Sequence, residues 1–259
     1  MKTTLILATM LALLSPAAFA KDKKTNLTHH GRIATLHKTV DRKYLPAEEQ
    51  KKHDADEKRL KDIEKQLADK KDLSPAEHVK LEKDMLEMEQ RINARKSGIS
   101  KIKPIHDKNE ADHKRIAKLH KGIPAMHLTP EERAEHEAHA KRIKEIGEKL
   151  NQGGLSEKEH GELATELQKM EGAAKVRQLA AERRAVLHKK NMAHYDRIAK
   201  LHAKIDVKKL KGPALEKHRL ISERLMKHHE ALTKGGLTDK EHAEIEKSLL
   251  SDEEELKKL

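Results

Sequence analysis

The sequence contains the same pattern three times. The segment Arg-Ile-Ala-x-Leu-His recurs at Arg32, Arg115 and Arg197, which places the copies at intervals of 83 and 82 residues. An asparagine precedes each copy at the same distance, and further histidines follow at matching offsets. A period this long and this regular is typical of a tandem array of one supersecondary unit. We therefore expect three copies of one fold rather than a single globule.

Each copy has the signals of three helices. Boxes of the form Ser/Thr-x-x-Glu predict helix starts, because the hydroxyl and the carboxylate satisfy free backbone donors of the first turn. These boxes begin at Ser74, Thr129, Ser156 and Thr238. Glycine pairs are expected to end the second helices. They lie at Gly153-Gly154 and Gly235-Gly236.

Neighbouring copies should share long helices. No proline lies between Ser156 and Ile205, so one helix can continue from the second copy into the third. Gly98 and Pro104 should kink or break the corresponding helix at the first junction. The predicted fold is all-α: an elongated tandem array of three short three-helix bundles joined by long shared helices, a layout that resembles that of spectrin repeats. The expected domains are 21–98, 99–180 and 181–259, after a signal peptide in 1–20.

The composition agrees with slender helical bundles. The chain has two Tyr, one Phe and no Trp, and 39% of its residues are charged. Such a composition is typical of long helices around a narrow aliphatic core. The net charge is +12, but basic and acidic residues are intermixed and aromatic residues that could stack on bases are almost lacking. We therefore expect no nucleic-acid partner.

The N-terminus has the features of a cleaved secretory signal. Lys2 precedes an apolar run from Leu5 to Leu14, and Ala18-Phe19-Ala20 forms an A-x-A cleavage site. The run is too short for an ordinary membrane span. A periplasmic or secreted protein is predicted. Because the chain has no cysteine, disulfides and thiolate metal sites are excluded.

Histidines recur at core-facing heptad positions. The chain has 19 of them, and neutral imidazole is the commonest ligand of Zn, Cu and Ni. His136 and His139 lie three residues apart on one predicted helix face, a spacing that can chelate one ion. Antiparallel packing should add His113 and His120 from the preceding helix. The full set of predicted metal ligands is His113, His120, His136, His139, His30, His37, His53, His202, His218, His188, His228 and His242.

The predicted turns also indicate which histidines lie at the same level, that is, at the same height along a helical bundle. A turn centred near Pro124 puts His136 opposite His113, with His120 nearby. The same construction gives three further groups. They are His53 with His30 and His37, His218 with Tyr195 and His202, and His106 with His160. In the last copy it brings together His188, His228 and His242.

Two other interpretations of the histidines stay open. Buried polar residues at core positions can fix the register of packed helices. His78, His160 and His242, each at the fourth position of a capped helix, could serve as hydrophobic staples. Alternatively, imidazoles in a thin core would become charged together near pH 6 and loosen the bundles.

Catalysis is not expected. The sequence lacks a nucleophile elbow and a glycine-rich phosphate loop, and His136-Glu137-Ala138-His139 is one residue shorter than the H-E-x-x-H motif of zinc proteases. A slim helical rod also offers no deep pocket for a substrate. The protein is therefore predicted to be non-enzymatic.

Four short segments resemble the L-T-x-x-Q motif of Spy/CpxP-type periplasmic helical stress proteins and their zinc-responsive relatives. They begin at Leu73, Leu128, Leu155 and Leu237, and glutamate replaces the motif's glutamine. The resemblance implies an envelope protein that acts as a chaperone or in metal stress. The first functional hypothesis is buffering or sequestration of a divalent transition metal. The alternative is an envelope chaperone or scaffold that contacts unfolded proteins, with self-association left open.

Overall fold

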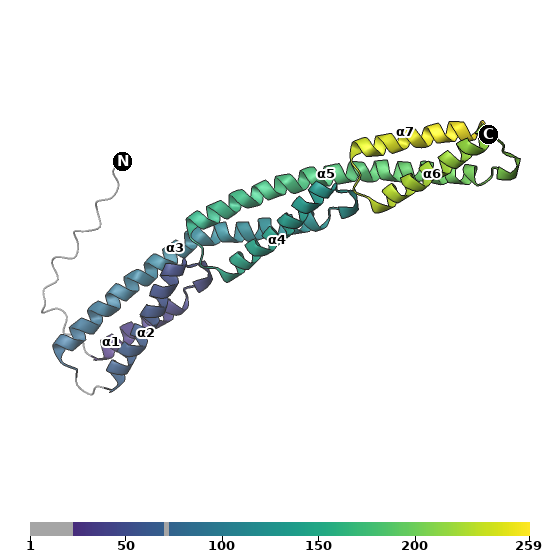
Figure 1. Cartoon of the computed structure of the whole chain (residues 1–259). Coiled ribbons are helices and arrows are strands. Elements are labelled where there is room, and N and C mark those ends of the chain that lie inside the picture. Colours follow the sequence, from purple (N-terminus) through teal and green to yellow (C-terminus); the bar gives the residue numbers. More distant parts are fainter. Residues whose placement is uncertain (1–22, 70–72) are drawn as a thin grey trace, which may run out of the picture. The chain divides into compact units, whose positions relative to one another are not determined.

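All regular structure in the described residues is helical. The computed structural model describes residues 23–69 and 73–259, and the all-α prediction is confirmed there (Figure 1). The elements are α1 (Lys23–Lys38), η2 (Arg42–Tyr44), α2 (Ala47–Asp69), α3 (Pro75–Lys121), η3 (Ala125–His127), α4 (Pro130–Gln152), α5 (Glu157–His202), η4 (Val207–Lys209), α6 (Pro213–Lys234) and α7 (Asp239–Leu256). The predicted signal peptide lies outside the described residues. No helix within them has both the length and the apolar character to cross a bilayer.

The capping boxes form as predicted. Before α3, the backbone N–H of Ser74 donates to Glu77 at 2.8 Å, and the Glu77 N–H donates to the Ser74 hydroxyl at 3.3 Å. Thr238 and Glu241 make the same reciprocal pair before α7. Equivalent bonds precede α4 and α5. Each helix start is therefore fixed by its own local sequence.

Of the predicted kink or break at the first junction, the break is wrong, because α3 continues through Gly98 and Pro104 from Pro75 to Lys121. Pro104 is exposed, as is Ser100, whose carbonyl would have accepted the missing N–H bond. Water can satisfy that carbonyl. Meanwhile the buried Ile102 and His106 hold the helix on both sides of the proline.

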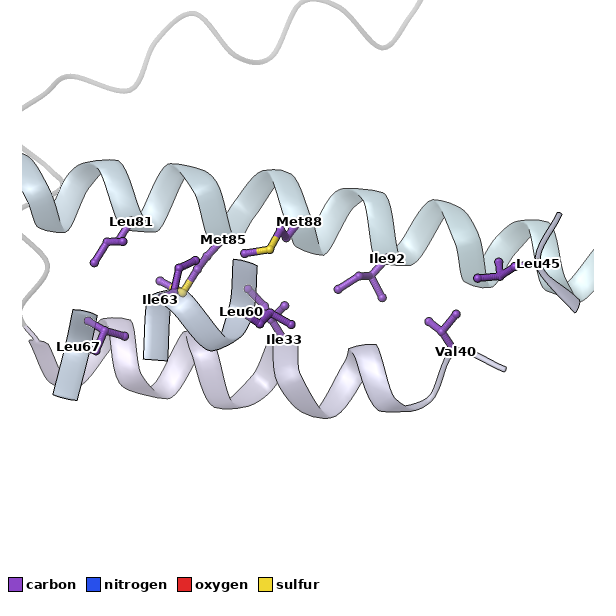
Figure 2. Close-up of a cluster of buried hydrophobic side chains, with 10 residues drawn as sticks. All are labelled: Ile33, Val40, Leu45, Leu60, Ile63, Leu67, Leu81, Met85, Met88 and Ile92. Carbon is purple, nitrogen blue, oxygen red and sulfur yellow. The ribbon is translucent and has the colours of Figure 1, made fainter. Parts of the chain in front are cut away.

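The chain divides into two compact units. One consists of the residues up to Lys108 together with Lys149–Gly161, and the other consists of Asn109–Glu148 together with Glu162–Leu259. In the first unit α1, α2 and α3 contribute to one apolar core. Figure 2 shows Ile33, Ile63 and Met88 from these three helices among its buried side chains. Burying a side chain of this size contributes about 1.5–3 kcal/mol to stability.

The second unit has two described clusters of buried apolar residues. Ile198 from α5, Ile221 from α6 and Leu249 from α7 belong to the larger one. A smaller one contains Leu128 and Ala181. The buried members of both are small or aliphatic, as the scarcity of aromatic residues predicts, and Tyr195 packs against the larger one.

Equivalent ion pairs recur at the repeat interval. An arginine of the Arg-Ile-Ala segment contacts a glutamate that follows it in the chain by 56 or 57 residues. The pairs are Arg32–Glu89 at 2.7 Å, Arg115–Glu171 at 2.6 Å and Arg197–Glu253 at 2.5 Å. The sequence repeat is therefore also a repeat of contacts.

The two glycine pairs dock on earlier turns. The Gly154 N–H donates to the Lys43 carbonyl at 3.2 Å, and the Gly236 N–H donates to the Met126 carbonyl at 2.9 Å. Gly153 and Gly235 have φ angles of 69° and 70°, a region that side chains with a Cβ rarely enter. Glycine is required at these positions by both the backbone angle and the close approach.

Candidate functional site

Three pairs of imidazole rings are stacked face to face at equivalent places in the repeats. We call them the stacked pairs. The ring centroids lie 3.7 Å apart in His37–His53, 3.6 Å in His120–His136 and 4.0 Å in His202–His218. The rings are inclined by 3°, 5° and 17° respectively. Each pair joins the helix before a 3-10 turn to the helix after it: α1 to α2, α3 to α4, and α5 to α6.

A hydrogen bond fixes the orientation of two of these stacks. The His37 ring donates from Nε2 to the backbone carbonyl of its own partner, His53, at 3.1 Å. His120 donates in the same way to the His136 carbonyl at 2.8 Å. Because Nε2 carries the proton, Nδ1 of His37 and of His120 is left with the lone pair.

The stacked pairs favour neutral imidazole. Burial lowers the pKa of His53, His120 and His202, and a neighbouring histidine adds to the effect at His53 and His202. The pKa of His136 falls to about 4, through burial first and then through His120, Arg177 and His139. Charging these rings would bring like charges together inside a desolvated layer.

Other rings meet at an angle instead of stacking. In the first unit Tyr44, His106 and His160 form a row with centroid distances of 5.1 and 5.2 Å and nearly perpendicular planes. The second unit has the equivalent row of His127, His188 and His242, with distances of 5.3 and 6.0 Å. We call these the first and second angled clusters. The predicted pairing of His106 with His160 is confirmed.

The predicted levels are correct for some histidines and wrong for others. His136 lies opposite His120 rather than His113, whose ring donates to the Ile143 carbonyl at 2.8 Å. His30 contacts the Leu60 carbonyl at 3.0 Å, although it was predicted to pair with His53.

The predicted groups in the last copy also change. His188 does meet His242, but His228 instead contacts the Ser248 hydroxyl at 2.8 Å. Tyr195 stacks on His229 rather than on His218.

Sequence reasoning missed two histidines. His127 lies in η3 at the position that Tyr44 occupies in the first copy, so aligning the turns of the repeats would have found it. His29 is buried between two carboxylates: its Nδ1 lies 3.1 Å from Glu82 and its Nε2 lies 3.1 Å from Glu89. The other copies have a different residue or a different partner there, and no repeat pattern marks it.

Buried asparagines stabilise the third helix of two copies. Asn26 donates to the His78 carbonyl at 3.3 Å, and Asn191 donates to the His242 carbonyl at 2.8 Å. The same amide groups lie 3.0 and 3.3 Å from the Nδ1 atoms of these histidines. These contacts support a structural role for the capped-helix histidines.

The stacked geometry does not suit metal binding. The lone pair of an imidazole nitrogen lies in the ring plane, so two parallel rings cannot both direct lone pairs at one ion between them. Within residues 23–69 and 73–259, no three His, Asp or Glu side chains already converge as metal ligands. The structure thus gives no support for metal binding by the stacked pairs, and for these histidines the metal hypothesis stays a prediction.

His139 faces a buried cation. Its Nδ1 accepts a hydrogen bond from Arg177, which is only 4% exposed. The first copy has Asp56 and Arg95 at the equivalent positions, where the carboxylate and the guanidinium lie 2.7 Å apart. Burial lowers the pKa of His139, and Arg177 lowers it further. The arrangement makes His139 a poor partner of His136 in a metal chelate.

Replacing His139 with aspartate should therefore stabilise the protein. The new carboxylate would give Arg177 the anion that Arg95 already has, and a charged hydrogen bond of this kind contributes about 1.5–3 kcal/mol. Urea unfolding at pH 7 measures the change, with His229→Asp at an exposed position as the control. A His139→Asp variant no more stable than the parent would contradict this account of the Arg177 site.

No protein-family model matches the chain, and comparisons with curated proteins and with solved structures found no match. Function is therefore inferred from the residues of this chain.

Proposed function

We propose that this protein is a non-enzymatic helical scaffold whose packing responds to pH. The observation that supports it most is the recurrence of a stacked imidazole pair in each of the three repeats. A single stack could be incidental to one turn. Three stacks at the same structural position indicate that each repeat contains a pair of rings whose protonation would disturb its packing.

The scaffold we propose is a tandem array of three three-helix bundles. Two sets of contacts support this layout. The core of the first unit combines residues of α1, α2 and α3, and a core of the second unit combines residues of α5, α6 and α7. The arginine–glutamate pairs recur at the repeat interval. A signal sequence, as predicted, would place this array outside the cytoplasm.

The charged groups around each stack set its response. Arg95, Asp54 and Asp56 act on the His53 ring, with the arginine opposing protonation and the carboxylates favouring it. Arg177 and His139 face the His120–His136 stack and oppose protonation. His218 is the charge neighbour of His202. Arg177 also pairs with Glu135 at 3.4 Å, but Glu135 is largely exposed, so the middle stack, which lies beside a buried arginine, should resist protonation most.

The sign of the pH effect follows from the lowered pKa values. Well above pH 6.5 the rings of His53, His120, His136 and His202 are neutral in both the folded and unfolded states. As pH falls below 6.5, the unfolded chain binds protons that the folded stacks exclude, so the free energy of unfolding decreases. The decrease for His136 continues to about pH 4. Each ring that stays neutral in the folded state lowers the free energy of unfolding by up to about 1.4 kcal/mol for each pH unit below 6.5.

A pH series of urea unfolding tests the proposal. We expect the free energy of unfolding to fall steadily between pH 7.5 and 5.0, above the range in which carboxylates titrate. A variant combining His120→Gln and His136→Gln should show a shallower slope. The control His229→Gln, at an exposed ring that stacks on Tyr195 and belongs to none of the stacked pairs, should keep the parent slope. Constant stability over this range, or an unchanged slope in the double variant, would rule the proposal out.

A further inference from the structure

The second angled cluster has three imidazoles where the first has two and a phenol. His127, His188 and His242 come from η3, α5 and α7, and all lie in the second unit. The first cluster has a similar row of rings, but Tyr44 stands in the place of His127 and its plane is inclined by 89° rather than 59° to the next ring. The repeat thus contains two similar sites, of which the first has two imidazoles that could bind a metal and the second has three.

The spacing of these rings suits a shared ion. Zinc binds imidazole nitrogen at about 2.0–2.1 Å, and two imidazoles on one tetrahedral ion place their ring centroids about 5 Å apart. The distances from His188 to His127 and to His242 are 5.3 and 6.0 Å, and the planes are inclined by 59° and 90°. The stacked pairs, with parallel rings at 3.6–4.0 Å, lack both features.

A carboxylate lies on the same helix as His242, three residues earlier. Asp239 Oδ1 is buried and accepts no hydrogen bond from the described residues. The Nε atom of Arg184 lies 3.5 Å from this oxygen, and the same guanidinium is paired with Glu132. The other oxygen of Asp239 contacts Arg183. Asp239 therefore has one oxygen that can contribute negative charge beside the histidines.

The protonation state also suits ligation. Burial lowers the pKa of His127 and of His242, and the neighbouring histidines lower both further. These two rings are therefore neutral at pH 7, and a neutral ring has the lone pair that a metal needs.

The geometry points to a divalent transition-metal site, best suited to zinc, formed by His127, His188 and His242 with Asp239 as the fourth ligand. The rings do not yet converge in the arrangement described, so binding requires one or more of them to turn about its side-chain bonds. The site does not depend on the proposed pH response. It differs from the sequence prediction in including His127 and in leaving out His228.

Calorimetric titration of the metal-stripped protein with ZnCl2 at pH 7 tests this site. We expect one site per chain, with His127→Tyr weakening it by about 100-fold or more. The reason is that removing a ligand should cost at least as much as removing a group that only orients one, which costs up to about 100-fold. Co²⁺ should give the visible absorption of a tetrahedral complex at the same stoichiometry. The substitution copies the residue that the first cluster already contains, so the variant should fold, and circular dichroism checks this.

Two further variants separate this site from general histidine affinity. His229→Tyr and His136→Gln should leave zinc binding unchanged. Tyr44→His should add a second site with His106 and His160, where Glu157 occupies the position of Asp239. Weak binding spread over many histidines, unchanged binding in His127→Tyr, or no gain in Tyr44→His would each overturn the proposal.

Discussion

Replacing Asp56 with alanine is expected to lower the free energy of unfolding by about 3–5 kcal/mol, because it leaves a buried guanidinium without its main counter-charge. Arg95 is 4% exposed, and its Nη1 lies 2.7 Å from Asp56. The remaining partner, Glu49, lies 3.2 Å from Arg95 and is a partly exposed side chain. Burial alone would raise the pKa of Asp56, yet bonds from Arg91 and Arg95 lower it. The pair is therefore electrostatically coupled.

Urea unfolding at pH 7 measures this loss. Asp107→Ala is a suitable control, because Asp107 pairs with Lys103 at 2.7 Å on the exposed surface and should contribute less than about 1 kcal/mol. Adding Arg95→Met to Asp56→Ala should restore much of the stability by removing the orphaned charge. A loss below 1 kcal/mol in Asp56→Ala, or no recovery in the double variant, would contradict the assignment.

The second large effect is expected at Gly153. A Cβ added there would lie 2.4 Å from the Lys43 carbonyl oxygen, and φ is +69°. The left-handed backbone costs a residue with a Cβ about 1–2 kcal/mol, and the overlap should cost about 1–3 kcal/mol more. We therefore expect Gly153→Ala to lower the free energy of unfolding by about 2–5 kcal/mol.

Gly172→Ala provides the matched control in thermal or urea unfolding. Gly172 lies within α5, and a Cβ there would meet nothing within 4 Å. Alanine should therefore stabilise the helix by about 0.5–1 kcal/mol. If Gly153→Ala and Gly172→Ala changed stability in the same direction, the docking of the glycine pair on the earlier turn would not be a stabilising contact.

Much of the fold follows from local sequence. The capping boxes and glycine pairs give helix ends within a residue or two, because each signal acts on the backbone beside it. Heptad spacing identifies buried positions such as Ile116 and His160, since a helix has one core-facing stripe. The break predicted at Pro104 does not occur because this proline is exposed to water. Its exposure depends on where the neighbouring helices pack, which the local sequence does not indicate.

The levels of the histidines were harder to predict. His120 and His136 are equidistant from Leu128, and so are His113 and Ile143, which places the centre of the turn at this fully buried residue. The prediction put the centre near Pro124. It had the start of the second helix right, at Pro130, but did not foresee that η3 occupies the residues between Pro124 and that start. A 3-10 turn advances the chain without reversing it fully, and the helical heptads carry no signal of its length.

Other predictions concern events outside a single chain. Secretion, contact with unfolded envelope proteins and self-association depend on partners or on residues 1–20, which are not among the described residues. Metal binding by His30 and by the histidines of the stacked pairs likewise stays a prediction. The arrangement of the rings now indicates where such binding is geometrically favoured.

The two tyrosines give the protein a built-in optical readout. The chain has no tryptophan, and each unit contains one tyrosine ring against a histidine: Tyr44 beside His106 at 5.1 Å, and Tyr195 beside His229 at 4.8 Å. An imidazole that gains a proton quenches the emission of a phenol next to it. In single-tyrosine variants, fluorescence therefore reports events in one unit at a time: Tyr44 in the first angled cluster, and Tyr195 of α5 against the exposed His229 of α6.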